Sequence, residues 1–256
     1  MPNITRTLVI ALVATACAAC HSSLPPSSPP SDVAVHVSHY GELRQIFHEQ
    51  DTSPKITLDE LTPDSTLYAV GALSELRGEI TVSAGQVFLS YAVTASSSET
   101  DVSTVSSEGA TLLVSAQVAS WLEVPIMDAI APESFDERIK SLSSAAGVST
   151  DGPFPFLIVG PAVALRWHVI DGRRLLPGSS SHADHLRAGV QHARDRADVT
   201  LIGFFSDAHQ GVFTHRGSST HVHCVLDSPP SSGHVDQVTV LPGATLFLPT
   251  SPESAG

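Results

Sequence analysis

The sequence predicts a β-rich α+β protein in which two β-subdomains, mixed or antiparallel, pack together with a few helices. Three observations lead to this class. Apolar stretches with the alternating pattern of strands recur in both halves of the chain, glycines separate several of them, and helical periodicity is confined to a few segments. A soft boundary between the subdomains is expected near residue 150.

Composition sets the limits of this class. With 256 residues, 42% of them hydrophobic and 15% charged, the chain is long and apolar enough to bury a large core. The formal net charge is −13. Such an acidic chain is a poor partner for nucleic acid or for an anionic membrane surface, so we expect neither.

The first 20 residues have the layout of a secretory signal. Arg6 precedes the apolar run "TLVIALVATACAAC", which is too short to span a bilayer and ends in small residues and two cysteines. A cysteine there resembles a bacterial lipoprotein cleavage site, with Cys17 the better lipid acceptor and Cys20 the alternative. We therefore expect export and attachment to the bacterial cell envelope by the lipid alone. Without lipidation, the protein would be periplasmic or secreted.

The signal is followed by a linker and then by the folded body. Residues 21–33 are rich in Ser and Pro and are predicted to form an extended tether. The folded domain is expected to cover 34–249, and 250–256 to be a tail. Cys224 is the only cysteine beyond the signal segment, so the body has no disulfide partner for it.

The first half of the folded body begins with helical signals and continues with strands. Residues 38–50 place Tyr40, Leu43 and Phe47 on one helical stripe. Thr57 and Glu60 have the spacing of a capping box. The strand-like stretches that follow, with turns expected at Gly71, Gly78 and Gly85, are 67–73, 78–82, 86–93 and 110–118.

The second half contains two predicted helices among further strands. A helix is expected over 133–147, ending at its glycine, and a polar helix around 182–196. On the polar helix, His182, His185 and His192 are interpreted as solvated surface histidines. The strand-like stretches are 154–160, 162–170, 198–205, 220–226 and 234–240.

Three histidines near the C-terminus carry the clearest chemical signal. Side chains two apart on a strand point to one face, so His221 and His223 project together while Cys224 faces the other way as a packed thiol. The midpoint between His223 and His234 falls inside a Pro/Ser/Gly turn. A hairpin closed there places His234 opposite His223 or diagonal to it, on the same face.

Three imidazoles with an open fourth position describe a catalytic zinc site. The histidines therefore predict Zn²⁺ or another divalent transition metal. The alternative at this point is a surface hairpin that carries its histidines by chance.

The segment "STHVHCVLDSPPSSGHV" resembles the metal-binding segment of bacterial α-acetolactate decarboxylases. Other parts of the chain resemble this family in the same order, over roughly residues 36–249. These parts are "YGELRQIF", "ITLDELTPDSTLYAVGALSELRGEITVSAGQVF", "LRWHVIDG" and "VTLIGFF".

The resemblance implies a zinc-dependent lyase that converts a 2-hydroxy-3-oxo acid, such as acetolactate, into acetoin and CO₂. It implies His221, His223 and His234 as metal ligands and a homodimer as the assembly. Glu79 matches the family's glutamate near the metal and would act as acid/base or hydrogen-bond partner. Without the resemblance, Glu79 reads as an exposed strand residue.

Two functional positions of the family are not matched. The family's substrate-binding arginine falls where this chain has serines, leaving Arg166, Arg173 and Arg174 as weak candidates. Phe247 stands where the family has a C-terminal glutamate that donates a proton. A phenyl ring cannot donate one, and positioned acids contribute about 10²–10⁴-fold to rate.

Three hypotheses follow for the function. The first is the exported decarboxylase. The second is a non-catalytic lipoprotein on the same scaffold that binds zinc or a ligand. The third is a structural or adhesion lipoprotein whose histidines are incidental.

Overall fold

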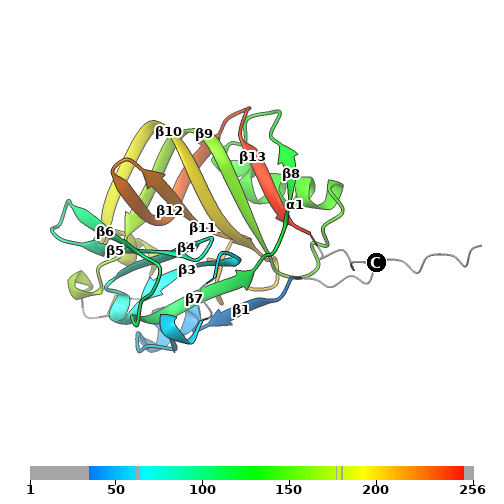
Figure 1. Ribbon diagram of the computed structural model, residues 1–256. Helices are drawn as coiled ribbons and strands as arrows, with labels where there is room; N and C mark the ends of the chain where they lie inside the picture. The colour runs from blue at the N-terminus through cyan, green and yellow to red at the C-terminus, as the bar shows by residue number, and fades with distance from the viewer. Residues whose placement is uncertain (1–34, 62–63, 177, 180, 251–256) are drawn as a thin grey trace, which may run out of the picture. The chain divides into compact units, whose positions relative to one another are not determined.

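The computed structural model describes residues 35–61, 64–176, 178–179 and 181–250, and it describes only the backbone of His182. Its described part consists mainly of two antiparallel sheets (Figure 1). The predicted signal segment with Cys17 and Cys20, the tether, and the tail beyond Thr250 lie outside the described residues. Among the helices that are described, none has the length and apolar character needed to cross a membrane.

The first sheet is built from the first half of the folded body. Its strand order is β1-β7-β3-β4-β5-β6, and β2 pairs with β7 as well. The strands are β1 (Val37–Tyr40), β2 (Ile56–Thr57), β3 (Leu67–Leu73), β4 (Gly78–Ser83), β5 (Gln86–Ala92), β6 (Ser98–Ser103) and β7 (Gly109–Gln117).

The second sheet has the order β10-β11-β12-β9-β13-β8. An additional pairing between β10 and β9 closes β9, β10, β11 and β12 into a ring. The strands are β8 (Trp121–Pro125), β9 (Phe154–Val169), β10 (Val190–Phe205), β11 (Thr220–Asp227), β12 (Pro230–Val240) and β13 (Thr245–Pro249). The chain changes sheets between Gln117 and Trp121, earlier than the soft boundary expected near residue 150.

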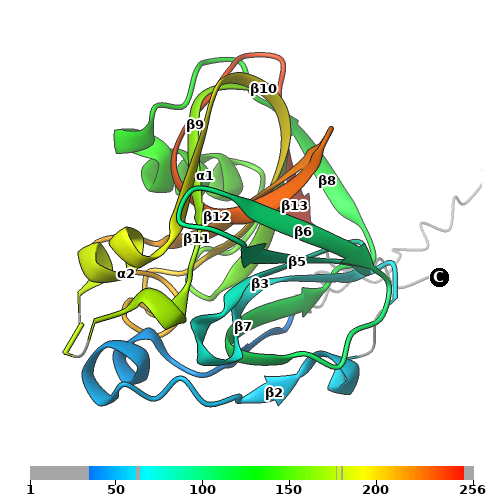
Figure 2. The same ribbon diagram turned by 90° about the vertical axis from the view of Figure 1, so that its left-hand side faces the viewer.

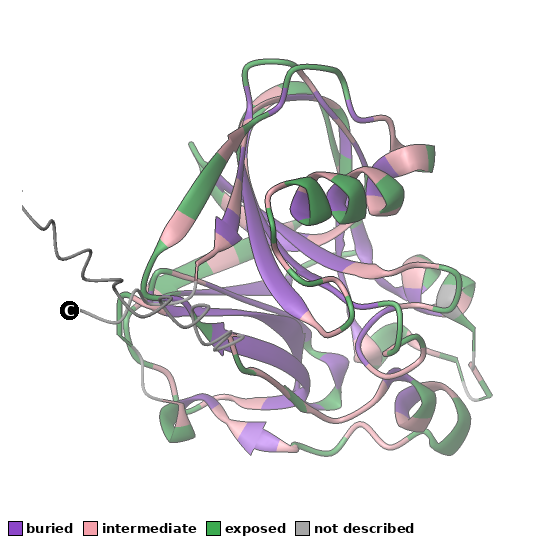
Figure 3. Ribbon diagram, turned by 90° about the vertical axis from the view of Figure 1, so that its right-hand side faces the viewer, coloured by how far each residue is buried: buried purple, intermediate pink, exposed green. Residues whose placement is uncertain are grey.

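The strands of the two sheets lie against each other (Figure 2). The apolar layer that joins them includes Val70 and Leu112 of the first sheet and Leu157, Phe204 and Val225 of the second. A separate cluster around Trp167 fills the other face of the second sheet, where helix α1 (Phe135–Ala145) adds Phe135 and Ile139. Buried residues therefore follow both sides of most central strands (Figure 3). The predicted β-rich α+β class is confirmed.

Alternation along two strands places polar side chains in the layer between the sheets. On β4, Ile80 and Val82 join an apolar cluster on the outer face, so Glu79 and Thr81 face the second sheet. On β11, Val222 and Cys224 join the Trp167 cluster, so His221 and His223 face the first sheet. Cys224 is fully buried, as predicted.

Short helical turns connect the strands. Thr57 N–H donates to Glu60 Oε1 over 3.0 Å, which confirms the predicted capping box. Besides α1, the helical segments are η1 (Gln45–Glu49, a π-helix), η2 (Leu58–Glu60), η3 (Ser74–Leu76), η4 (Pro132–Ser134), η5 (Gly172–Arg174) and α2 (His182–Ala188).

The helix predicted over 38–50 is wrong in its first part. Residues Val37–Tyr40 form β1, and the helical part begins only at Leu43 and runs through η1 to Glu49. The alternation of apolar residues in this stretch fits either period. Pairing of β1 with β7 selects the strand because it satisfies backbone groups that an isolated short helix would leave to water.

The polar helix predicted around 182–196 is also wrong beyond its first two turns. It ends at Ala188, and residues from Val190 onward form β10, which pairs with β9 along its whole length. The charged residues that favour a helix in the sequence pattern, Arg194, Asp195 and Arg196, are consecutive and all exposed in this part of β10. Gly71 was expected in a turn but lies inside β3, and the two strands predicted over 154–170 are one strand, β9.

Candidate metal centre

The β11–β12 hairpin closes as predicted. His223 pairs with His234 and Asp227 with Pro230, so two residues form the turn. On the other side of β12, His234 pairs with His168 of β9. A Cβ at Gly233 would lie 2.4 Å from the carbonyl oxygen of His168, so only glycine lets these strands approach here.

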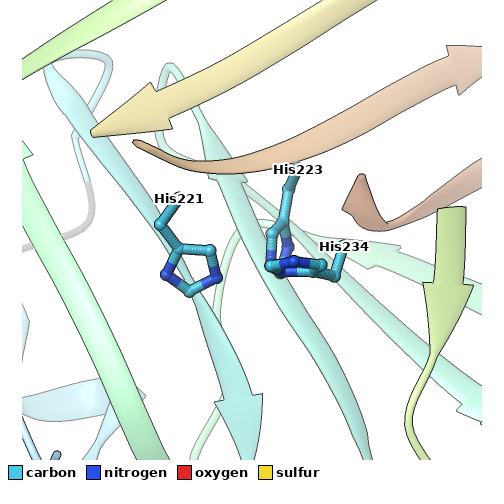
Figure 4. Close-up of side chains that lie close together, drawn as sticks. All are labelled: His221, His223 and His234. Carbon is cyan, nitrogen blue, oxygen red and sulfur yellow. The ribbon is translucent and has the colours of Figure 1, made fainter. Parts of the chain in front are cut away.

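The hairpin brings His221, His223 and His234 together (Figure 4). One ring nitrogen from each lies within 4.8 Å of the other two, and the ring centroids are 5.0–5.6 Å apart. Tetrahedral zinc with Zn–N bonds of about 2.0–2.1 Å needs ligand nitrogens ~3.3 Å apart. Small ring rotations would reach that separation, so three histidines could hold one metal ion.

The chemical state of these rings fits a metal. His221 Nδ1 and His223 Nε2 are buried and have no hydrogen-bond partner among the described residues. Burial lowers the pKa of His221 to about 4 and holds the pKa values of His223 and His234 well below the usual range. All three imidazoles are therefore neutral at pH 7, which is the state that binds metal.

Thr81 of β4 orients His223. Its Oγ1 lies 2.9 Å from His223 Nδ1 and accepts a 2.6 Å hydrogen bond from Ser232 Oγ. If Nε2 is the ligand atom, Nδ1 carries the proton and donates it to Thr81. Such a partner fixes the tautomer and the ring direction of a metal-binding histidine.

Glu79, two residues before Thr81, is buried rather than exposed, with 4% of its surface accessible. Its Oε1 accepts a hydrogen bond from Ile170 N–H over 3.1 Å, and its Oε2 lies 3.8 Å from His223 Nε2. Burial raises the pKa of this carboxyl to about 7. Glu79 can therefore hold or release a proton near neutral pH.

His168 and Asp236 adjoin Glu79 and were not singled out from the sequence. His168 Nδ1 lies 2.8 Å from Asp236 Oδ1, and its Nε2 lies 3.9 Å from Glu79 Oε1. Burial disfavours the charged form of His168. The Asp236 hydrogen bond and charge, followed by the Glu79 charge, outweigh it and raise the His168 pKa. Asp236 stands two residues after His234 on a predicted strand, a spacing that could have indicated it.

A small cavity of about 60 Å³ opens beside these groups. Glu79, His168, His221 and His234 form its polar side, and His185 and His215 also line it. His185 is buried against the edge of Phe47, with ring centroids 4.7 Å apart, so the solvated position expected for it is wrong. The apolar side consists of Leu43, Ile46, Phe47, Gly71, Ala72, Leu76, Leu112 and Ile170.

This arrangement of strands matches solved structures of one enzyme. α-Acetolactate decarboxylase from Bacillus subtilis strain 168 superposes with a TM-score of 0.66 at 14% identity, over 84% of this chain and 85% of that chain. The acetolactate decarboxylase of Bacillus subtilis subspecies spizizenii gives 0.66 at 13% identity, over 84% and 86%. The chain has the α-acetolactate decarboxylase fold.

A Staphylococcus aureus protein of unknown function, described as similar to α-acetolactate decarboxylase, gives a TM-score of 0.63 at 16% identity, over 85% of this chain and 86% of that chain. No family model matches the sequence, and no curated protein matches it either. At such identities the likeness establishes the α-acetolactate decarboxylase fold, and activity must be argued from the site.

On this α-acetolactate decarboxylase fold, the three candidate arginines do not line the cavity. Arg173 donates to Asp171 Oδ1 over 2.7 Å and to the carbonyl of Ala92 over 2.8 Å. Arg166 and Arg174 are exposed. Within the described residues, the cavity lining contains no arginine or lysine.

Phe247 also lies away from the cavity. It sits on β13, paired with Glu123 and Leu157, and packs against the apolar layer between the sheets. The position that would carry the family's glutamate is therefore part of the packing in this chain.

Proposed function

We propose that the protein is a zinc-dependent carboxy-lyase that decarboxylates acetolactate or a related 2-hydroxy-3-oxo acid to an acetoin-type product and CO₂. One observation carries the proposal. Three neutral imidazoles converge beside a buried carboxyl of raised pKa, at a small cavity on the α-acetolactate decarboxylase fold.

His221, His223 and His234 are the residues that would hold the metal, with Thr81 orienting His223. Zinc bound there would supply Lewis acidity that polarises the carbonyl of the substrate. The apolar wall of the cavity keeps bulk water from the reacting atoms.

Glu79 is the residue we assign to proton transfer. Decarboxylation breaks the bond between C2 and the carboxylate, and the electron pair stays on the substrate until carbon receives a proton. Glu79 Oε2 lies 3.8 Å from His223 Nε2, and burial raises the pKa of this carboxyl to about 7 in the metal-free chain, so Glu79 is placed to hold that proton. His168, fixed by Asp236, lies beside Glu79 and favours its ionised state through charge.

The direct test supplies racemic acetolactate to the purified, zinc-loaded chain and measures acetoin and CO₂. We expect Glu79→Gln to lower turnover by about 10²–10⁴-fold while retaining zinc. Glu123→Gln, an exposed glutamate on β8, is the matched control and should keep full activity. Turnover no higher than that of His223→Ala, with acetolactate and with longer 2-hydroxy-3-oxo acids alike, would reject the proposal.

A second candidate is a non-catalytic protein that binds zinc or a ligand on the same scaffold. The packed position of Phe247 and the lack of an arginine or lysine in the described cavity lining favour it. This candidate predicts zinc that depends on the three histidines and no acetoin. Acetoin formation in the assay above would eliminate it.

We also propose export with lipid attachment at Cys17, or at Cys20, and a homodimeric assembly. Labelled fatty acid should be incorporated by the wild type and lost in Cys17→Ser or Cys20→Ser, which also identifies the acceptor. Light scattering of the purified chain measures the assembly, and a monomer mass would reject the dimer.

A further inference from the structure

A second, larger hollow adjoins the candidate metal centre. This groove has a volume of about 710 Å³. Its lining comes from residues 132–133 and 135–137 around the start of α1, from residues 217–220, and from residues 234–238 of β12. Ligand sites in proteins have volumes of about 300–1,000 Å³, so the groove is large enough to hold a small molecule.

The groove and the small cavity meet at His234 and His215, which line both. His234 keeps part of its surface accessible, whereas His221 and His223 are buried. One ring nitrogen from each of the three histidines lies within 4.8 Å of the other two, so the cluster borders the groove through His234. A ligand held at the three histidines therefore has the groove as its continuation.

The two spaces differ in size. The cavity beside Glu79, at about 60 Å³, has room for the reacting end of a substrate and little more. A compact substrate such as acetolactate would leave the groove unused. A substrate with a longer chain would fill it.

Charge restricts what that chain can be. The groove is lined by carboxylates, and its described lining contains no lysine or arginine. Asp136 is bound to Ser218, Ser219 and Thr220, and Asp236 to His168. Glu133 and Glu137 are exposed on its wall. Their field repels a second negative charge on the ligand.

We propose that the groove holds the remainder of the substrate, which is a 2-hydroxy-3-oxo acid with an extended chain that carries no second negative charge. This inference rests on the proposed function, because it places the reacting end at the three histidines. For the same site, it proposes substrates with a longer chain than acetolactate.

Hydroxamates test the groove without requiring turnover, because they chelate zinc through two oxygens. The probes are acetohydroxamate and three hydroxamates with a six-carbon chain that ends in an ammonium, a hydroxyl or a carboxylate group. Calorimetry with the zinc-loaded full chain measures each Kd. We expect the ammonium and hydroxyl probes to bind about tenfold more tightly than acetohydroxamate, and the carboxylate probe not to.

Two pairs of variants test whether the tails of the probes bind in the groove. Gln237→Trp fills the groove from β12, and Gln86→Trp makes the same change at an exposed glutamine of β5. Only Gln237→Trp should remove the advantage of the long probes, while both keep the Kd of acetohydroxamate. Glu137→Lys should reverse the preference between the ammonium and carboxylate tails, and Glu123→Lys should not.

The outcomes separate this inference from the proposed function. Three outcomes would overturn the groove proposal and leave the proposed function untouched. These are equal Kd values for all four probes, a Kd that is lowest for the carboxylate probe, and tighter binding of the long probes that persists in Gln237→Trp. Tight binding of acetohydroxamate without turnover of acetolactate would reject acetolactate as the substrate. The groove proposal would still stand if the Kd values of the long probes depended on their terminal groups. If no hydroxamate binds, the metal site and the groove proposal both fall.

Discussion

Replacing Thr81 by valine should weaken zinc binding without touching any ligand. Thr81 is fully buried, and valine preserves its shape while removing the hydroxyl that bonds to His223 and Ser232. Loss of a partner that orients a metal-binding histidine costs about 10–100-fold in affinity. That factor corresponds to about 1.4–2.7 kcal/mol of binding free energy.

The same change should also destabilise the metal-free protein. The Ser232 hydroxyl and His223 Nδ1 lose a buried partner, and a stranded group of this kind costs about 1–3 kcal/mol. Zinc affinity is measured by competition with a chromophoric chelator, and the free energy of unfolding by urea titration.

Thr111→Val is the matched control for Thr81→Val. Thr111 is also fully buried in the first sheet, but its hydroxyl donates to the carbonyl of Thr52 over 2.5 Å, away from the histidines. It should lose stability and keep zinc affinity. If both valine variants bound zinc as tightly as the wild type, Thr81 would not orient His223 and our description of the centre would be wrong.

Three further predictions concern pH and packing. In the metal-free protein the pKa of His221 is about 4, below its value of 6.5 in the unfolded chain, so the unfolded chain protonates first and stability falls as pH drops. Between pH 7 and 5 the free energy of unfolding, measured by urea titration, should fall by about 2 kcal/mol more in the wild type than in His221→Phe. Equal decreases would contradict the burial of this ring. Gly233→Ala should cost about 1–3 kcal/mol of stability and also weaken zinc binding, because its Cβ would push β12 away from the His168 carbonyl. An unchanged zinc affinity would contradict this displacement of β12. Phe247→Glu should lower the melting temperature and give no gain in acetoin formation, since this side chain packs between the sheets; a gain would show that it reaches the cavity.

The local part of the candidate site could be predicted from the sequence. Alternation along 220–226 fixed the face of His221 and His223, and the turn composition fixed where the hairpin closes. Pairing across a two-residue turn needs no information from the rest of the chain. For that reason, the position of His234 opposite His223 was predicted correctly.

The groups around the histidines could not be predicted in the same way. Thr81 precedes its hydrogen-bond partner His223 by 142 residues. His168 precedes its partner Asp236 by 68 residues. Which residues of two distant strands or sheets meet depends on register and packing, which no local pattern records. Glu79 was predicted only through the family resemblance, and Asp236, two residues after His234, is the one further group that had a local signal.

The two helical errors have a common physical cause. Residues 38–50 and 182–196 contain short polar stretches whose periodicity fits a strand almost as well as a helix. Their conformations are decided by the available partners, β7 for Val37–Tyr40 and β9 for the strand that starts at Val190. Strand propensity depends on such pairing more than on the sequence itself.

The central claim is that three histidines bind one metal ion. The zinc content of the purified protein tests it most directly. The purified full chain, His223→Ala and His192→Ala are dialysed against a mild chelator and their zinc is measured by elemental mass spectrometry. His192 is the control, because it lies on β10 and bonds to Ser98 instead of joining the cluster. We predict one zinc per chain in the wild type and in His192→Ala, and none in His223→Ala. A wild type without zinc, or His223→Ala with as much zinc as His192→Ala, would contradict the account.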